Sequence, residues 1–377
     1  MTAAHLRPAW AEVDLGVIAA NTAELVRLCT PALVCAVVKA NGYGHGSVEV
    51  ARAALAGGAA WLGVALVEEG VTLREAGVTA PILLLSEPAA EAMPEALAHD
   101  LRLSLYTELG AAAAAEAAAD TGQGRVPVHV KVDTGMHRVG ASADDAVDLA
   151  VRVAENPVLH LEGFWTHLAV ADEPEQSEVT KLQLERFESA RSLLADRGVT
   201  PDLLHTANTG GATAFVEARY DLVRTGIGIY GYPASPSLAG RVALTPAMAL
   251  KAEVSFVKVL DAGERISYGL RYAMPERGRV ATVPLGYADG VPRRLSACGG
   301  EVLIRGRRLP LAGTVTMDQV MVDCGDAPIE RGDEVVFIGA QGDEVITAED
   351  WARLTDTISY EIVCGIGPRV PRRYVGG

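Results

Sequence analysis

The chain has 377 residues, and its 33 basic against 48 acidic side chains give a formal charge of −15 at pH 7. This negative balance argues against nucleic acid or an anionic membrane as the main partner. No apolar run approaches the ~20 residues of a membrane span, the N-terminus lacks a signal-peptide pattern, and the five cysteines form no CxxC pair. A cytoplasmic protein with reduced thiols is therefore expected.

The first 230 residues alternate short apolar runs with alanine-rich helical stretches, after an expected helix over 14–28. The runs cover 33–39, 61–66, 81–86, 101–106, 126–133, 159–167, 203–208 and 221–226. Ser47 and Glu108 stand where two of the helices should begin. Eight such repeats predict a TIM-type (β/α)₈ barrel. A doubly wound open sheet is the alternative, weakened because no G-x-G-x-x-G follows the first strand.

After about residue 240 the pattern changes to short β-branched runs separated by Gly, Pro and Asp, with one helix near 348–356. This pattern predicts a mostly antiparallel β-domain. The turn-rich segment "GYPASPSLAGR" marks the break, so we expect a barrel domain over 1–240 and a β-domain over 241–377. Residues 1–12 either belong to the first domain or associate with the second.

Polar side chains stand at or near the ends of several predicted barrel strands. They are Lys39, Lys131, His167, Asn208 and Arg224. In a barrel these strand ends share one face, which is where active sites are built. Each residue alone is most simply a solvated rim residue, but the group on one face predicts a functional site.

Two loops near this face suggest a phosphate site. "ANTGGA" and "RTGIG" place glycines, a hydroxyl and free N–H groups after the seventh and eighth strands, where barrels often bind phosphate. A phosphate and a lysine around one pocket suggest pyridoxal 5′-phosphate (PLP), whose aldehyde forms a Schiff base with lysine. A sugar-phosphate enzyme with a Schiff-base lysine is the alternative at this point.

Nine motifs together resemble the alanine racemase family, in the family's order, from Lys39 to the C-terminus. They are "VVKANGYGHG", "KVDTGMHRVG", "THLAVAD", "HTANTGGA", "DLVRTGIGIYG", "SYGLRY", "PLGYADG", "TVTMDQ" and "GPRVPRRY". The resemblance implies a PLP-dependent isomerase that interconverts L- and D-alanine and supplies D-alanine for peptidoglycan. It also implies a head-to-tail homodimer in which the β-domain of one subunit completes the active site of the other.

The same resemblance assigns roles to individual residues. Lys39 would hold the cofactor and exchange a proton with D-alanine, and Tyr268 of the other subunit would do so with L-alanine. His167 and Arg224 would form a relay to that tyrosine. Arg224 would also face the pyridine nitrogen, where an arginine can only donate.

The remaining implied residues bind cofactor or substrate, and no metal site is expected. Besides Lys39 and Arg224, the cofactor would contact Tyr43, Asn208, Thr209, Gly226, Ile227 and Tyr360. The substrate would contact Arg138, Tyr287, Met317 and Asp318. Lys131 occupies a position that is often carbamylated in the family, where it would orient Arg138.

Two positions depart from the commoner family pattern. Thr209 stands where serine is usual, which keeps a hydroxyl and adds a methyl group. Thr225 stands where proline is usual, which removes a backbone restraint beside the expected phosphate. Both changes bear on cofactor affinity and leave the catalytic groups in place.

Three other functions remain to be weighed against an alanine racemase. A racemase of broader amino-acid specificity would keep every motif. A decarboxylase of the same barrel is disfavoured because it would lack the "GYADG…TMDQ" arrangement. A non-catalytic PLP-binding protein is disfavoured because such proteins resemble the barrel alone.

Overall fold

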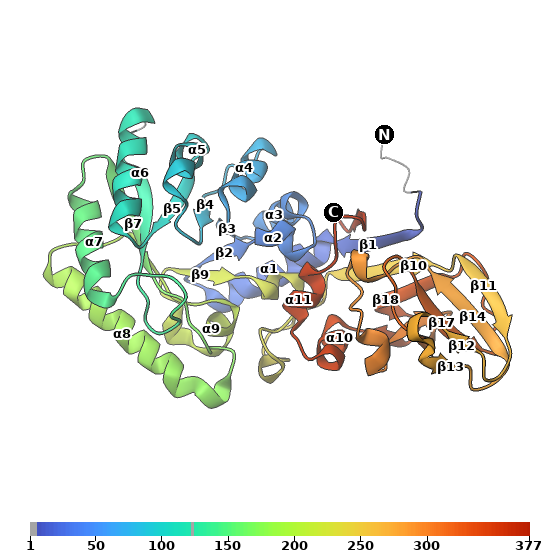
Figure 1. Ribbon diagram of the computed structural model, residues 1–377. Coiled ribbons are helices and arrows are strands. Elements are labelled where there is room, and N and C mark those ends of the chain that lie inside the picture. Colours follow the sequence, from blue (N-terminus) through green and yellow to red (C-terminus); the bar gives the residue numbers. More distant parts are fainter. Residues whose placement is uncertain (1–5, 122–123) are drawn as a thin grey trace. The chain divides into compact units, whose positions relative to one another are not determined.

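The computed structural model describes residues 6–121 and 124–377 (Figure 1). Their contacts divide them into two compact units. One contains residues 16–42 and 46–246, and the other contains residues 6–15, 43–45 and 247–377. The short segment 43–45 therefore packs with the second unit, although it follows the first barrel strand in the chain.

The first unit is built on eight parallel strands. They are β2 (Leu33–Val37), β3 (Trp61–Val64), β4 (Ile82–Leu84), β5 (Leu101–Leu105), β6 (Val126–Lys131), β7 (Leu159–Trp165), β8 (Leu203–His205) and β9 (Leu222–Thr225). Their order is β8-β7-β6-β5-β4-β3-β2-β9. Between β9 and β8, Arg224 N donates to Ala207 O at 2.9 Å and Asp221 N to Leu204 O at 3.0 Å. The sheet therefore closes, which confirms the barrel and excludes the open-sheet alternative.

Helices cover the outside of the strands, as Figure 1 shows for α4 to α8. They are α1 (Leu15–Cys29), α3 (Ser47–Ala56), α4 (Val67–Glu75), α5 (Met93–Ala98), α6 (Glu108–Thr121), α7 (Ala143–Glu155), α8 (Ser177–Asp196) and α9 (Thr209–Ala214). Short 3₁₀ turns occur at Ala90–Ala92, Pro174–Gln176, Val216–Ala218, Ile227–Tyr230 and Pro236–Leu238. The helix starts predicted at Ser47 and Glu108 are confirmed.

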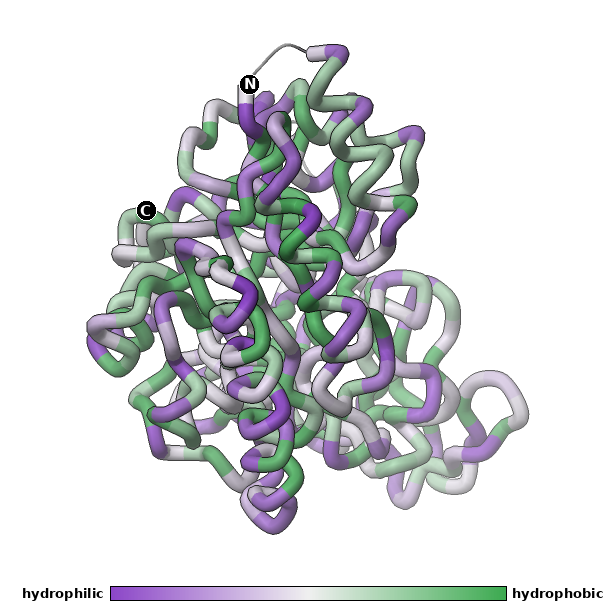
Figure 2. Tube along the Cα trace, turned by 90° about the vertical axis from the view of Figure 1, so that its left-hand side faces the viewer, coloured by the Kyte–Doolittle hydropathy of each residue, from purple (hydrophilic) through white to green (hydrophobic). Residues whose placement is uncertain are grey.

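The outer helix α7 is amphipathic, and its sequence shows why these residues form a helix. Ser142 caps its start by accepting a hydrogen bond from Asp145 N at 3.3 Å, and Arg152 stands in its last turn. Acidic residues early and basic residues late complement the helix dipole. Its apolar side chains face inward, and Figure 2 shows hydrophobic and hydrophilic positions alternating along such segments.

The second unit contains three sheets. The strands are β1 (Ala9–Asp14), β10 (Met248–Glu253), β11 (Phe256–Leu260), β12 (Arg265–Ile266), β13 (Tyr272–Ala273), β14 (Gly278–Val283), β15 (Glu301–Ile304), β16 (Arg307–Pro310), β17 (Val320–Gly325), β18 (Glu334–Gln341), β19 (Glu344–Ile346) and β20 (Arg372–Val375). Their orders are β16-β15-β18-β10-β1-β20 with β19 on β18, β11-β14-β17, and β12-β13. Every pair is antiparallel except β1 with β20, so the prediction of a mostly antiparallel domain is confirmed.

Short helices complete the second unit. They are η6 (Tyr268–Leu270), η7 (Tyr287–Asp289), η8 (Leu295–Cys298), α10 (Ala348–Thr355) and α11 (Ser359–Cys364). The predicted helix corresponds to α10, which Thr347 and Asp350 begin with reciprocal capping hydrogen bonds. Within the described ranges, no helix of either unit combines the length and apolarity that a bilayer crossing requires.

Candidate active site

Lys39 lies two residues after the end of β2 and begins an unusual turn, α2 (Lys39–Tyr43). Ala40, Asn41 and Gly42 have left-handed backbone angles, with φ of 52°, 53° and 61°. For residues with a Cβ this conformation costs roughly 1–2 kcal/mol each. Glu69 offsets part of that cost, because its carboxylate accepts a hydrogen bond from Ala40 N at 2.6 Å. Backbone strain of this kind is typical of functional sites.

Lys131 ends β6 and is 3 % exposed. Burial, with smaller effects from the Arg224 and Arg138 charges, lowers the pKa of its ammonium to about 7. Asp133 opposes this shift, and the Lys39 charge adds to it. Lys131 Nζ and Arg224 Cζ lie 4.3 and 4.5 Å from the centroid of the Trp165 ring, so these two predicted residues lie together, and the charges of Lys39 and Arg138 act on the same amine.

His167 follows β7 and responds to the same cluster. Burial, then the charges of Arg224, Lys131, Arg138 and Lys39, hold the pKa of its imidazole well below the usual value. His167 is therefore neutral at physiological pH, with one ring nitrogen that accepts a hydrogen bond and one that donates.

Arg224 is a buried cation on β9, with 2 % of its surface exposed. Nη2 donates to Thr166 O at 2.8 Å and Thr206 O at 3.0 Å, and lies 3.4 Å from His167 Nδ1. Nη1 donates to His205 Nδ1 at 2.9 Å. Burial lowers the pKa of the guanidinium to about 10, so it stays protonated at neutral pH. These contacts fix a charged donor in one orientation.

The loops after β8 and β9 are tied together by hydrogen bonds. Asn208 Oδ1 accepts from Gly211 N at 2.9 Å and caps α9. Thr209 Oγ1 accepts from Gly226 N at 3.0 Å, which leaves its hydroxyl hydrogen to donate elsewhere. Ile227 begins the next 3₁₀ turn. The hydroxyl hydrogen of Thr209 is the donor that these bonds leave available, and no carboxylate takes part in them, which suits a phosphate.

The two departures from the family pattern are accommodated inside the barrel. The extra methyl of Thr209 lies 3.0 Å from where a Cβ on Gly228 would be, so the threonine fills space that this glycine leaves open. Thr225 is fully buried, and its Oγ1 has no hydrogen-bond partner among the described residues. A buried hydroxyl of this kind is compatible with a polar ligand at this loop.

Five predicted site residues lie in the second unit with Tyr268. Tyr43 and Tyr360 have ring centroids 6.1 Å apart, and Tyr43 is buried. Tyr287 N donates to Thr316 O at 3.0 Å, which joins the "GYADG" motif to the segment before Met317. Two further predicted residues, Asp318 and Met317, belong to that segment, and Asp318 accepts from Arg369 at 2.7 Å.

Tyr268 is 74 % exposed, yet its backbone is fixed. Ser267 and Leu270 flank it with φ of 67° and 49°. Ser267 Oγ donates to Thr314 O at 2.7 Å, and Thr314 Oγ1 donates to Tyr268 O at 2.8 Å. The phenol is thus presented to solvent from a rigid loop.

Sequence reasoning missed several residues that hold these groups. Asp289 is fully buried and accepts two hydrogen bonds from Arg7, at 3.0 and 2.8 Å, and one from Gly286 N at 3.0 Å. In the barrel, His205 contacts Arg224, and His129 contacts His205. The one available signal was a charged or polar residue inside an otherwise apolar strand.

Two family models together match nearly the whole chain. They are "Alanine racemase, N-terminal domain" over residues 13–234 and "Alanine racemase, C-terminal domain" over residues 247–374. An alanine racemase of Symbiobacterium thermophilum is 51 % identical over 373 residues, which cover 98 % of each chain. The chain thus matches this relative and both family models over nearly all of its length.

Solved structures agree with these sequence matches. The crystal structure of alanine racemase from D-cycloserine-producing Streptomyces lavendulae superposes with a TM-score of 0.93, at 39 % identity and 98 % coverage of both chains. A histidine racemase from Leuconostoc mesenteroides gives 0.90 at 32 % identity, again with 98 % coverage of both. Similar folds therefore carry racemases of different amino acids.

Proposed function

Because the chain belongs to the alanine racemase family, we propose that it interconverts L- and D-alanine by a two-base mechanism. The family is PLP-dependent, and its members are isomerases. The observation that carries the proposal is the cluster at the strand ends, where the charges of Lys39, Arg138 and the buried Arg224 all act on the buried Lys131.

When bound, PLP supplies the electron-withdrawing group that makes the Cα proton of an amino acid acidic. The protein must then remove that proton from one face of Cα and return one to the other face. Lys39 Nζ serves the face from which D-alanine loses its proton. Tyr268 Oη serves the opposite face, from which L-alanine loses its proton.

The donors described above suit the two ends of the cofactor. Arg224 would face the ring nitrogen as a permanent donor, which keeps that nitrogen unprotonated. Thr209, Gly226, Ile227, Tyr43 and Tyr360 would hold the phosphate, beside Asn208. Since arginine withholds a proton from the ring, protonation is directed to Cα, as a racemase requires.

We further propose that Tyr268 serves the partner subunit of a homodimer. Its exposure is unusual for a catalytic side chain, and large apolar side chains elsewhere in the same unit are also exposed, including Leu270 at 53 % and Met317 at 52 %. An open hollow of about 800 Å³ beside Tyr268 is lined by apolar side chains, among them Leu260 and Met321, and also by the charged Lys258, Glu264 and Arg265. Exposed apolar surface of this kind marks interaction sites.

On the substrate side, Arg138 and the Met317 backbone N–H would bind the carboxylate of alanine, with Tyr287 and Asp318 beside them. His167 would connect Arg224 to the partner's tyrosine, which is consistent with its neutral imidazole. In the cell, the D-alanine product would serve peptidoglycan synthesis in the cytoplasm.

Lys131 is expected to carry a carbamate, formed when its neutral amine adds CO₂. With a pKa of about 7, half of the amine is neutral at neutral pH, so adduct formation should rise between pH 6 and 8. The adduct would convert a cation into an anion that accepts hydrogen bonds from Arg138. ¹³C NMR of protein equilibrated with [¹³C]bicarbonate measures it, and Lys251→Gln, a lysine paired with Glu12, is the control. A carbamate signal that survives in Lys131→Gln would contradict the assignment.

The direct test of function is a racemisation assay with a panel of amino acids. Purified protein should convert L-alanine to D-alanine, without release of CO₂. Conversion of several amino acids at similar kcat/KM would favour the broader racemase, for which the histidine racemase neighbour gives a specific reason. A protein that binds PLP without any turnover would overturn the proposal in favour of a cofactor-binding role.

A further inference from the structure

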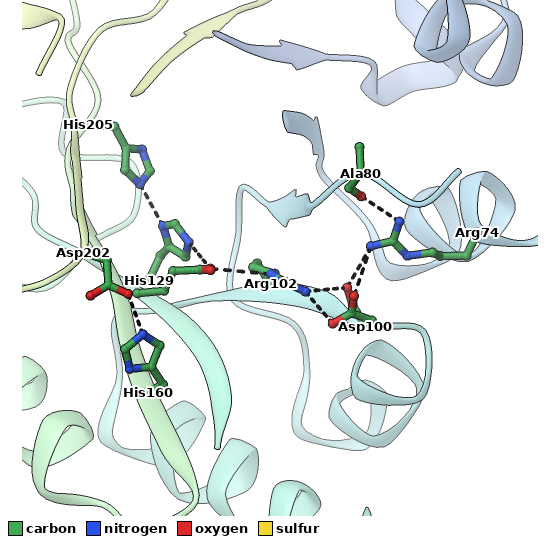
Figure 3. A network of polar contacts seen from close by, with 9 residues as sticks. Arg74, Ala80, Asp100, Arg102, His129, His160, Asp202 and His205 are labelled. Carbon is green, nitrogen blue, oxygen red and sulfur yellow. Dashed lines mark hydrogen bonds and ion pairs between the residues drawn. The ribbon is translucent and has the colours of Figure 1, made fainter. Parts of the chain in front are cut away.

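A line of polar side chains runs through the barrel interior away from Arg224. His205 accepts from Arg224, and its Nε2 lies 2.9 Å from His129 Nδ1. His129 Nε2 lies 3.0 Å from Glu162 Oε2, and Arg102 Nε lies 3.6 Å from the same oxygen. Figure 3 shows His205, His129 and Arg102 along this line. Both imidazoles are fully buried.

The pairing of β6 with β7 makes room for the side chains of His129 and Glu162. Between β6 and β7 the register steps from Val128 opposite Leu161 to His129 opposite Gly163, so Glu162 has no partner in the ladder. Such a bulge re-aims the side chain of the extra residue. At Gly163 a Cβ would lie 2.0 Å from His129 Nδ1, so this glycine is required for the ring to occupy its place.

The chemistry of the two ends allows only one direction of donation. A guanidinium has no acceptor, so His205 Nδ1 must accept from Arg224. Burial lowers the pKa of both imidazoles, so each is neutral and carries one N–H. His205 therefore donates from Nε2 to His129 Nδ1, and His129 donates from Nε2 to Glu162. An ionised carboxylate can only accept, so it completes the series.

We propose that Glu162 is a positioning residue for Arg224, acting through His129 and His205, which it locks as Nε2–H tautomers. With both rings locked, His205 presents an acceptor to Arg224 and the guanidinium keeps the orientation set by Thr166 and Thr206. The inference rests on the proposed role of Arg224 at the ring nitrogen of the cofactor. Carboxylate–histidine pairs orient metal-bound histidines in the same way.

The tautomers can be read in the wild-type holoenzyme, without any variant. Neutron crystallography of deuterated protein should show deuterons on Nε2 and none on Nδ1 in both His129 and His205. A deuteron on Nδ1 of either ring would overturn the proposal, because donation could then not run from Arg224 to Glu162.

Glu162→Gln tests the consequence, because glutamine keeps the volume but can donate as well as accept. We expect kcat to fall about tenfold with KM changed by less than about twofold, and the visible absorption of the bound cofactor to shift. The control is Asp202→Asn, which alters the exposed pair in which His160 Nε2 lies 2.6 Å from Asp202 Oδ2, also drawn in Figure 3. Asp202→Asn should change neither property.

Arg224→Lys separates this inference from the proposed function. If Arg224→Lys shifts the absorption and lowers kcat while Glu162→Gln does neither, Glu162 is not a positioning residue, although the role of Arg224 stands. If Arg224→Lys itself changes neither, the proposed role of Arg224 fails, and with it the basis of the inference.

Discussion

Lys39→Ala is expected to yield a folded protein that neither racemises alanine nor holds PLP covalently. Lys39 is proposed to be both the attachment point and one of the two proton carriers, so its removal takes away two functions at once. Loss of a positioned acid–base group alone costs roughly 10²–10⁴-fold, and we expect activity to fall by about 10⁴-fold or more. Initial rates, and mass spectrometry after borohydride reduction, measure the two losses.

The matched control for this variant is Lys251→Ala. Lys251 lies on β10 and pairs with Glu12 at 3.0 Å, outside the barrel-face cluster. Its removal should leave both the rate and the reduced adduct unchanged. A reduced adduct of normal yield in Lys39→Ala, attached to another lysine such as Lys131, would show that the cofactor's attachment point has been misassigned.

The barrel strands were predictable from sequence because parallel strands in a barrel are covered on both faces. Runs such as Leu33–Val37 and Trp61–Val64 are apolar throughout, so the local sequence pattern predicts buried strands directly. The strand-end site followed from the same topology. Lys39, Lys131 and Arg224 are far apart in sequence, but a closed parallel sheet must bring its strand ends to one face.

Pairing between the chain ends was not predictable in this way. β1 lies between β10 and β20, and its pairing with β20 joins residues such as Glu12 and Arg373 across most of the chain. β20 is basic and short, with no apolar alternation to mark it as a strand. The prediction had placed residues 1–12 within the barrel domain and allowed for their association with the β-domain, and no local sequence signal could have decided between the two.

The residues that hold the site in place could not be predicted from the sequence, for a different reason. Glu162 looks like an outward residue of an alternating strand, and only a register step at His129 shows that it faces an imidazole. The left-handed turn after Lys39 is similar, since Ala40 does not favour positive φ. Both features depend on tertiary contacts that offset a local cost.

Tyr268→Phe is expected to abolish racemisation while Lys39 still exchanges the Cα proton of D-alanine. Since the enantiomers have equal free energy, kcat/KM must fall by the same factor in both directions, so rates alone cannot show which face is affected. Exchange of the Cα hydrogen in D₂O can. Exchange on L-alanine should fall by about 10²–10⁴-fold, while D-alanine, served by Lys39, continues to exchange. ¹H NMR follows both reactions.

Tyr272→Phe is the control within the same hairpin. Tyr272 Oη donates to Asp323 at 2.6 Å, so this phenol already has a partner inside its own unit. Its removal should alter neither exchange reaction. Equal loss of exchange on both enantiomers in Tyr268→Phe would contradict the assignment of one base to each face.

Mixing the two inactive variants tests which chain supplies Tyr268. If each site combines Lys39 of one subunit with Tyr268 of its partner, a heterodimer of Lys39→Ala and Tyr268→Phe chains has one intact site and one doubly altered site. With two sites per symmetric dimer, random reassociation of equal amounts should restore about one quarter of wild-type activity. If both residues came from one chain, every site would lack one base, and heterodimers verified by native mass spectrometry would remain inactive.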